Sequence, residues 1–133
     1  VIDHPLDSSK YLVHATTESN DAVVVYSGQI TLSDGKATIS LPSYFSELTE
    51  SGSETFSLTS NQVNNRVIIV ENTPTDTGFF TLKSEFLQDN HVVFWEVKAN
   101  RKLDFEVEPL KSDYKLNGSG PYTYLTRKQG TDL

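Results

Sequence analysis

The clearest strand pattern in this chain is Ala22–Leu41, AVVVYSGQITLSDGKATISL. Apolar and polar residues alternate in both of its halves, around Ile30 and around Ile39, which is the two-residue period of a strand with one buried face. Between the halves lie Asp34 and Gly35. This pair accepts the positive φ angles of a type I′ turn, the commonest two-residue connection between antiparallel strands. The stretch therefore predicts a β-hairpin.

Further strands are predicted on both sides of this hairpin, from the same alternation, from strand composition at Tyr11–Thr16 and from a short apolar run at Val67–Val70. Within the hairpin, the continuous apolar run Val23–Tyr26 indicates a segment in the middle of the interior. In HVVFWEV the spacing places Trp95 on one face with two valines and Phe94 on the opposite face with Glu96. The other predicted strands are Tyr11–Thr16, Glu54–Thr59, Val67–Val70, Phe79–Leu82, His91–Val97 and Leu103–Val107.

One short helical turn interrupts the strands. Pro42 suits a first helical position, and Tyr44, Phe45 and Leu48 recur at the spacing of one buried helical stripe. NTPTDTG, at Asn72–Gly78, reads as a loop. The prediction is an all-β fold, an antiparallel β-sandwich or barrel of about seven to eight short strands with one short helical turn.

The length of 133 residues favours one domain. We expect the β-sandwich domain to occupy residues 1–111. Apolar residues become sparse after Pro109, and Asn117–Pro121 is expected to interrupt regular structure. Residues 112–133 are therefore predicted to be a C-terminal tail, extended or packed on a neighbouring subunit. The absence of Met, even at position 1, favours a processed chain or a fragment of a longer protein.

Composition excludes several classes of function. Eleven basic and eighteen acidic side chains give a formal charge of −7, which repels phosphate backbones, so no nucleic-acid partner is expected. There is no Cys, hence neither disulfide nor thiol chemistry. The sequence contains no apolar run of transmembrane length and no signal-peptide pattern at its start, so no membrane insertion is expected.

From the sequence we expect the protein not to be an enzyme, and we expect neither a catalytic residue nor a cofactor. A nucleophile signature such as G-x-S-x-G is missing, and the chain has three His residues. His4, His14 and His91, with Asp3 and Asp7, have ligand chemistry but not the spacing that aims two imidazoles at one metal. The alternative that stays open is a metal ion on a threefold axis, which would need only one His from each of three chains.

The acids of the predicted turns have the ligand chemistry of a calcium site. Asp34, with Asp21 and Asp76, lacks the spaced carboxylates of an EF-hand loop. We expect these acids to form turns rather than a metal site.

Aromatic residues in polar surroundings are the candidate contacts for a ligand or a subunit interface. They are Tyr114, Tyr122 and Tyr124, the last two in GPYTYLTR. Trp95 has apolar neighbours and is predicted to lie in the core. Asn117-Gly118-Ser119 matches the acceptor pattern for N-glycosylation, which has meaning in a eukaryotic secretory pathway.

A set of motifs spread over residues 2–111 carries a family resemblance: Ile2–Asp7, Lys10–Leu12, His14, Glu18-Ser19, Val25–Gly28, Asp34-Gly35, Leu41-Pro42, Tyr44-Phe45, Leu48, Phe56–Thr59, Val93–Val97 and Arg101. Together they resemble a β-rich domain near the C-terminus of phage tail-fibre proteins and related bacterial surface fibres, whose opening motif is IDHPLDP…KYL. This chain has Ser8 where that motif has Pro, and it departs from the family again across Glu50–Thr55.

The resemblance implies a homotrimeric fibre module, extracellular or on the virion surface, at or near the distal end. Its role would be structural or adhesive, with a cell-surface receptor or glycan as partner. The alternative is a monomeric carbohydrate-binding module of a secreted protein, with Tyr122, Tyr124 and the Asn72–Gly78 loop as contacts. A small hydrolase is a third, weaker alternative.

Overall fold

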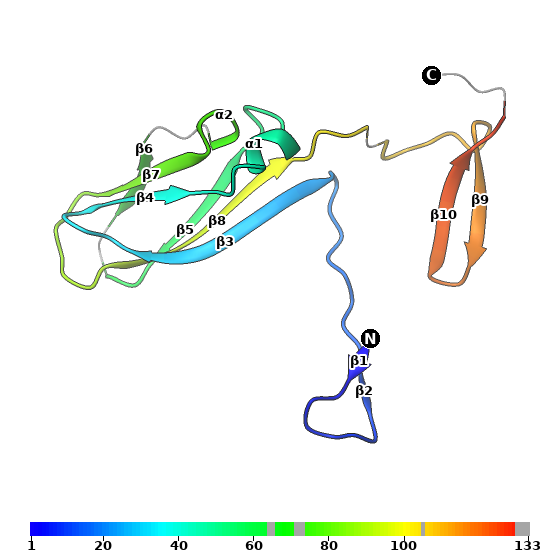
Figure 1. Ribbon diagram of the computed structural model, residues 1–133, viewed down its shortest axis with the longest axis horizontal. Coiled ribbons are helices and arrows are strands. Elements are labelled where there is room, and N and C mark those ends of the chain that lie inside the picture. The colour runs from blue at the N-terminus through cyan, green and yellow to red at the C-terminus, as the bar shows by residue number, and fades with distance from the viewer. Residues whose placement is uncertain (64–65, 71–73, 105, 130–133) are drawn as a thin grey trace.

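A computed structural model describes residues 1–63, 66–70, 74–104 and 106–129 (Figure 1). Its elements are strands and two helices of one turn each. In chain order they are β1 (Ile2–Asp3), β2 (Tyr11–Leu12), β3 (Val23–Thr31), β4 (Lys36–Ser40), α1 (Phe45–Leu48), β5 (Thr55–Ser60), β6 (Val67–Val70), α2 (Pro74–Thr77), β7 (Phe79–Ser84), β8 (Val92–Asn100), β9 (Tyr114–Ser119) and β10 (Tyr122–Arg127).

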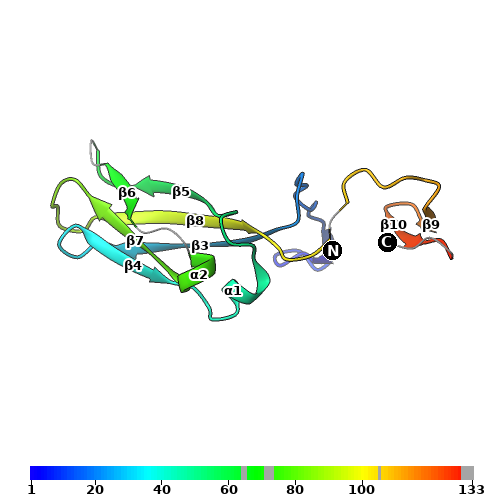
Figure 2. The same cartoon turned by 90° about the horizontal axis from the view of Figure 1, so that it is seen from above.

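Two antiparallel three-stranded sheets form a β-sandwich (Figures 1 and 2). One sheet has the strand order β3-β8-β5, and the other has the order β4-β7-β6. The predicted all-β sandwich with a short helical turn is confirmed. β5 and β6 lie where the alternation predicted strands, while β7 and β8 extend past their predicted ends.

The core lies between the two sheets and follows the alternation of β7 and β8. Phe80 and Leu82 of β7 and Val93 and Val97 of β8 have no exposed surface. The ring of Phe80 meets the rings of Phe56 and Trp95 edge to face, at centroid distances of 5.1 and 5.6 Å. Trp95 therefore faces the core, as predicted. Fully burying a side chain such as that of Phe80 stabilises the fold by about 1.5–3 kcal/mol.

The predicted turn at Asp34-Gly35 is confirmed, but the predicted hairpin pairing around it is wrong. Both residues have positive φ, 51° and 74°. A single bridge, Ser33 to Lys36, joins the two sides among the described residues. Beyond it β3 pairs with β8 and β4 with β7. The turn connects the two sheets. The apolar faces of β3 and β4 cover the same core from opposite sides.

The prediction that Val23–Tyr26 lies in the middle of the interior is also wrong. β3 is an edge strand with β8 as its neighbour in the sheet. Val24 and Tyr26 pack against the core, whereas Val25 is exposed on the outer face. No third layer covers that face among the described residues, so the apolar run alternates in burial despite its composition.

Two predicted strands near the ends of the sandwich differ from the structure. β2 ends at Leu12, so Val13–Thr16 is not strand. No strand forms in the described part of Leu103–Val107, where both terminal residues are exposed. The chain leaves the sheet after Asn100, and a polar-apolar alternation forms a strand only where a partner strand supplies hydrogen bonds.

The predicted helical turn is α1, and its stripe is only partly buried. Phe45 is fully buried and stacks against Tyr26 at 5.3 Å between ring centroids, while Tyr44 is exposed. Buried Thr49 donates from Oγ1 to the Phe45 carbonyl at 2.6 Å and ends the turn. α2 lies beside α1 and forms within the predicted loop, of which Asn72 and Thr73 lie outside the described residues.

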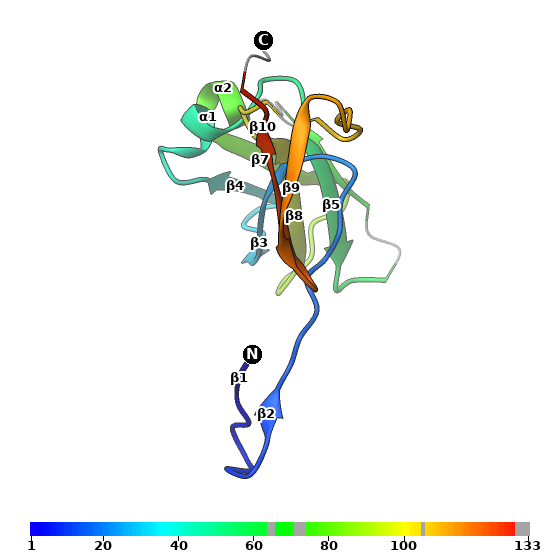
Figure 3. The ribbon, with the colours of Figure 1, turned by 90° about the vertical axis from the view of Figure 1, so that its right-hand side faces the viewer.

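Two hairpins lie outside the sandwich, β1–β2 before it and β9–β10 after it (Figures 1 and 3). The sandwich strands thus run from Val23 to Asn100. The C-terminal segment is a hairpin and not an extended tail. The predicted break at Asn117–Pro121 is wrong for residues 117–119, which end β9, and only Gly120 and Pro121 form the turn. Gly118 takes φ 87°, and a Cβ there would stand 2.0 Å from the Tyr122 carbonyl oxygen. The glycines permit the close crossing that closes the hairpin.

Candidate binding surfaces

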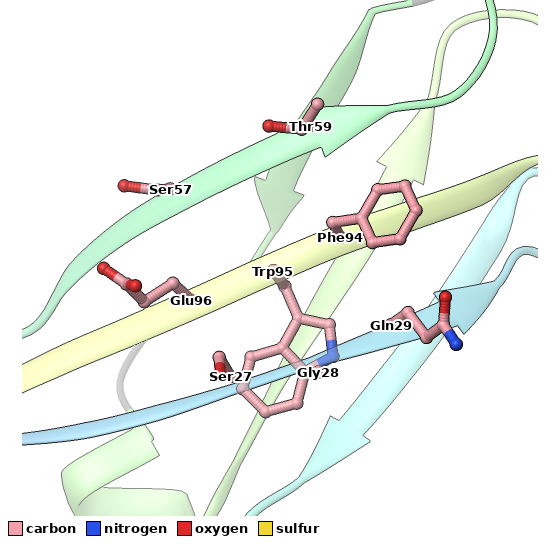
Figure 4. A pocket seen from close by; sticks show the side chains of 8 residues that line it. All are labelled: Ser27, Gly28, Gln29, Ser57, Thr59, Phe94, Trp95 and Glu96. Atoms are coloured by element: carbon pink, nitrogen blue, oxygen red, sulfur yellow. The ribbon is translucent and has the colours of Figure 1, made fainter. Parts of the chain in front are cut away.

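The outer face of the β3-β8-β5 sheet carries a shallow hollow of about 470 Å³ (Figure 4). Its side chains are set by strand register. Gln29, Phe94 and Thr59 pair across the three strands and form one row. The neighbouring row, two residues along each strand, is Ser27, Glu96 and Ser57.

Phe94 supplies the aromatic ring in the hollow. It lies on the central strand with 48% of its surface exposed, and hydroxyl and amide groups surround it. Below it, the indole of Trp95 lies against Gly28, whose missing side chain leaves room for the ring. The carboxylate of Glu96 forms an ion pair with Lys98 Nζ at 3.4 Å on the same face. The sequence predicted the outward direction of Phe94 and Glu96, but it did not predict the neighbours from β3 and β5.

The three candidate tyrosines lie on the β9–β10 hairpin and divide between its two faces. Tyr122 and Tyr124 alternate along β10 and share one face, with 80% and 62% of their surfaces exposed. Tyr114 pairs with Arg127 across the hairpin and lies on the other face, near the pair Leu116 and Leu125. The structure therefore brings two of the predicted residues together and separates the third.

Tyr114 is the centre of a small polar cluster. Its hydroxyl donates to Glu106 Oε2 at 3.0 Å and accepts from Arg127 Nη2 at 2.7 Å. The Arg127 guanidinium carbon also lies 4.9 Å from the centre of the Tyr114 ring. The hydrogen bond to the Glu106 carboxylate raises the pKa of Tyr114, since that acceptor favours the protonated hydroxyl. The contact between Tyr114 and Arg127 connects the start of β9 to the end of β10.

The histidines occupy three separate environments. His91 is buried, and its Nε2 lies 2.6 Å from Ser60 Oγ. His4 accepts the Leu6 backbone N–H at Nδ1, and His14 is exposed in the segment between β2 and β3. Within the described ranges, no three His, Cys, Asp or Glu side chains gather as they would around a metal ion.

The acids considered for calcium serve local structure. Asp34 occupies the turn between β3 and β4, and Asp21 accepts the Ala22 N–H. Asp76 of α2 accepts from Ser51 Oγ at 2.8 Å. In the first hairpin, hydrogen bonds from Ser9, together with Lys10, hold the pKa of Asp7 below its usual range.

Two other sequence features are involved in internal contacts. Pro74 and Thr75 of the predicted Asn72–Gly78 loop are buried, and Thr75 donates from its N–H and its hydroxyl to Glu54. Asn117, in the glycosylation pattern, donates from Nδ2 to the Lys115 carbonyl and to Thr126 Oγ1. Nδ2 is the atom to which a glycan would be attached, so modification would replace one of its two N–H donors and break one of these bonds.

Comparisons with protein-family models, curated proteins and solved structures found no match for this chain. None of the helices described is long and apolar enough to cross a membrane.

Proposed function

We propose that this chain is a non-enzymatic structural and adhesion module of a trimeric fibre, extracellular or on a virion surface. The observation that carries the proposal is the pair of terminal hairpins, which expose apolar side chains. On β9–β10, Leu116 and Leu125 form an exposed cross-strand pair beside Leu110. In the first hairpin Leu6 and Tyr11 are exposed.

A two-stranded hairpin alone is at best marginally stable in water. It becomes stable when its apolar face packs on another surface. In the single chain the sandwich does not cover these faces, among the residues that the structure describes. A neighbouring copy of the chain would bury them, which is how symmetric oligomers are commonly stabilised.

The topology of the sandwich supports such packing. Val23, where the chain enters β3, is the cross-strand partner of Asn100, where it leaves β8. Both hairpins therefore extend beyond the same end of the sandwich (Figures 1 and 2). Three chains arranged about an axis at that end would each offer two hairpins to their neighbours.

The burial of His91 favours a non-enzymatic role. Its Nε2 faces Ser60 Oγ at the end of the sandwich where β5 ends and β8 begins. A catalytic histidine has to exchange a proton with the reacting groups, and His91 is buried although Ser60 is only partly buried. The Ser60–His91 contact serves packing in this proposal.

The test is the mass of the isolated chain by sedimentation equilibrium at micromolar concentration. We expect three times the 14.9 kDa of one chain. The double variant Leu116→Ser with Leu125→Ser should lower the mass, because it removes the apolar pair of the second hairpin. The matched control is Ile68→Ser with Val70→Ser, which changes two exposed apolar residues on the outer face of β6. A wild-type chain that sediments as a monomer over this range would refute the trimer.

A monomeric carbohydrate-binding module remains the second candidate. The aromatic and polar hollow on the β3-β8-β5 sheet favours it. Mass separates the two candidates directly, because only the first requires association.

A further inference from the structure

The outer face of the β3-β8-β5 sheet is a second surface, made from different residues than the terminal hairpins. Its two rows, Gln29-Phe94-Thr59 and Ser27-Glu96-Ser57, bring six side chains onto one face. The rows come from three strands that are distant in the sequence. Strand pairing holds their backbones in place, which is the rigid support a binding site requires.

The chemistry of the six side chains is that of a sugar site. A sugar ring has an apolar C–H face and a rim of hydroxyl groups. Phe94 offers an exposed aromatic surface to the apolar face. Around it, the Gln29 amide and three hydroxyls can both donate and accept hydrogen bonds with the rim, and the Glu96 carboxylate can accept them.

The small area of this site argues against a folded protein as the ligand. Neighbouring strands are about 4.8 Å apart and alternate residues along a strand about 6.7 Å apart, so the six positions cover about 10 by 7 Å. This is the footprint of one or two sugar rings. A standard protein interface takes about 800 Å² from each partner.

The charges in and around the hollow favour a neutral ligand. Glu96 is the only charged side chain among the described residues that line the hollow, and Lys98 pairs with it from the next position on that face. The chain as a whole carries −7, which repels sulfated or phosphorylated glycans. No cluster of basic side chains lines the hollow to offset that repulsion.

We propose that this face binds a neutral saccharide, with one sugar ring stacked on Phe94 and its hydroxyls held by Gln29, Glu96 and the flanking Ser and Thr side chains. The site goes beyond the assembly role, since it needs no contact from the hairpins. In a fibre it would provide the attachment chemistry. The hollow is shallow and open, so binding of a single sugar is expected in the millimolar range, about 1 mM.

The experiment is an NMR titration of the full chain with glucose, galactose, mannose and N-acetylglucosamine, and with sialic acid as the anionic comparison. A neutral sugar should shift the amides of β3, β8 and β5 around Phe94, and sialic acid should not. Phe94→Ala should weaken the binding about tenfold or more. Glu96→Gln should weaken it less, since an amide can still accept and donate.

The matched control is Phe79→Ala on the outer face of the opposite sheet, where 37% of Phe79 is exposed. This variant should bind as the wild type does. Sedimentation of Phe94→Ala keeps this proposal separate from the trimer, since the mass should not change. A lower mass would show that the face is an interface between copies and would overturn the sugar site. Equal loss in both variants, or no shift with any neutral sugar, would overturn it as well.

Discussion

The indole ring of Trp95 lies directly over Gly28, its cross-strand partner in β3, and its Cζ2 would be 2.9 Å from a Cβ at that position. Gly28 thus leaves the space that lets Trp95 reach across the inner face to Phe80, at 5.6 Å between ring centroids.

The first prediction concerns this contact. Gly28→Val should displace the indole and destabilise the protein by about 1–3 kcal/mol, because the new methyl groups overlap the ring. Urea unfolding measures the loss, and tryptophan fluorescence should move to longer wavelength as the ring becomes more exposed. Ser27→Val, which adds a similar side chain on the outer face, is the control. Equal stability of the two variants would show that the Gly28–Trp95 contact is not a constraint.

Phe80 is the second test, because it joins the two sheets. Phe80→Ala removes a fully buried ring that touches Phe56 and Trp95, and should cost about 3–5 kcal/mol. Phe79→Ala, one residue earlier on the outer face of the same strand, should cost much less. Both free energies of unfolding come from chemical denaturation. A small loss for Phe80→Ala would mean that the sheets do not share this core.

The Ser60–His91 contact gives a third prediction. Ser60→Ala deprives the buried Nε2 of His91 of its partner at 2.6 Å. The expected cost is about 1–3 kcal/mol, the usual penalty for leaving a buried polar group without its hydrogen bond. Thermal unfolding measures it, with Ser57→Ala on the exposed face of the same strand as the control. Similar melting temperatures for the two variants would contradict a structural role for the pair.

The fourth prediction is a pH dependence of the C-terminal hairpin. The hydrogen bond to Glu106 raises the pKa of Tyr114 above its ordinary value of 10.0. The folded hairpin therefore favours the protonated tyrosine. This contribution to stability is complete below pH 10.0 and is lost as the pH rises through the higher folded pKa. NMR titration of the Tyr114 ring measures that pKa.

Glu106→Gln should lower the pKa of Tyr114, because it removes the carboxylate that stabilises the protonated hydroxyl. Glu108→Gln, a nearby exposed acid outside this cluster, should leave it unchanged. If both variants shift the Tyr114 titration equally, long-range charge rather than the hydrogen bond sets it.

Local sequence patterns predicted the six strands of the sandwich, β3 to β8, and the direction of the side chains in β8. The alternation in β8 placed Trp95 on one face with two valines, and Val93, Trp95 and Val97 belong to or pack against the core. Asp34 and Gly35 predicted their turn from local backbone preference alone. These features depend on neighbours within a few residues, so local patterns are sufficient.

Strand pairing was not predictable from these local patterns and depends on contacts between distant segments. An apolar face indicates that a strand covers a core, but it does not specify from which side, so β3 and β4 were expected as one hairpin and lie in different sheets. The pairing of β8 with β3 and β5 also forms the hollow around Phe94, because it places residues of both strands beside that ring. It also left Leu103–Val107 without a partner strand, while residues 114–127 formed a hairpin from their own two halves. Segments distant in the sequence compete for positions around one hydrophobic core. The local pattern of one segment says nothing about the other segments, so it cannot predict the strand with which that segment pairs.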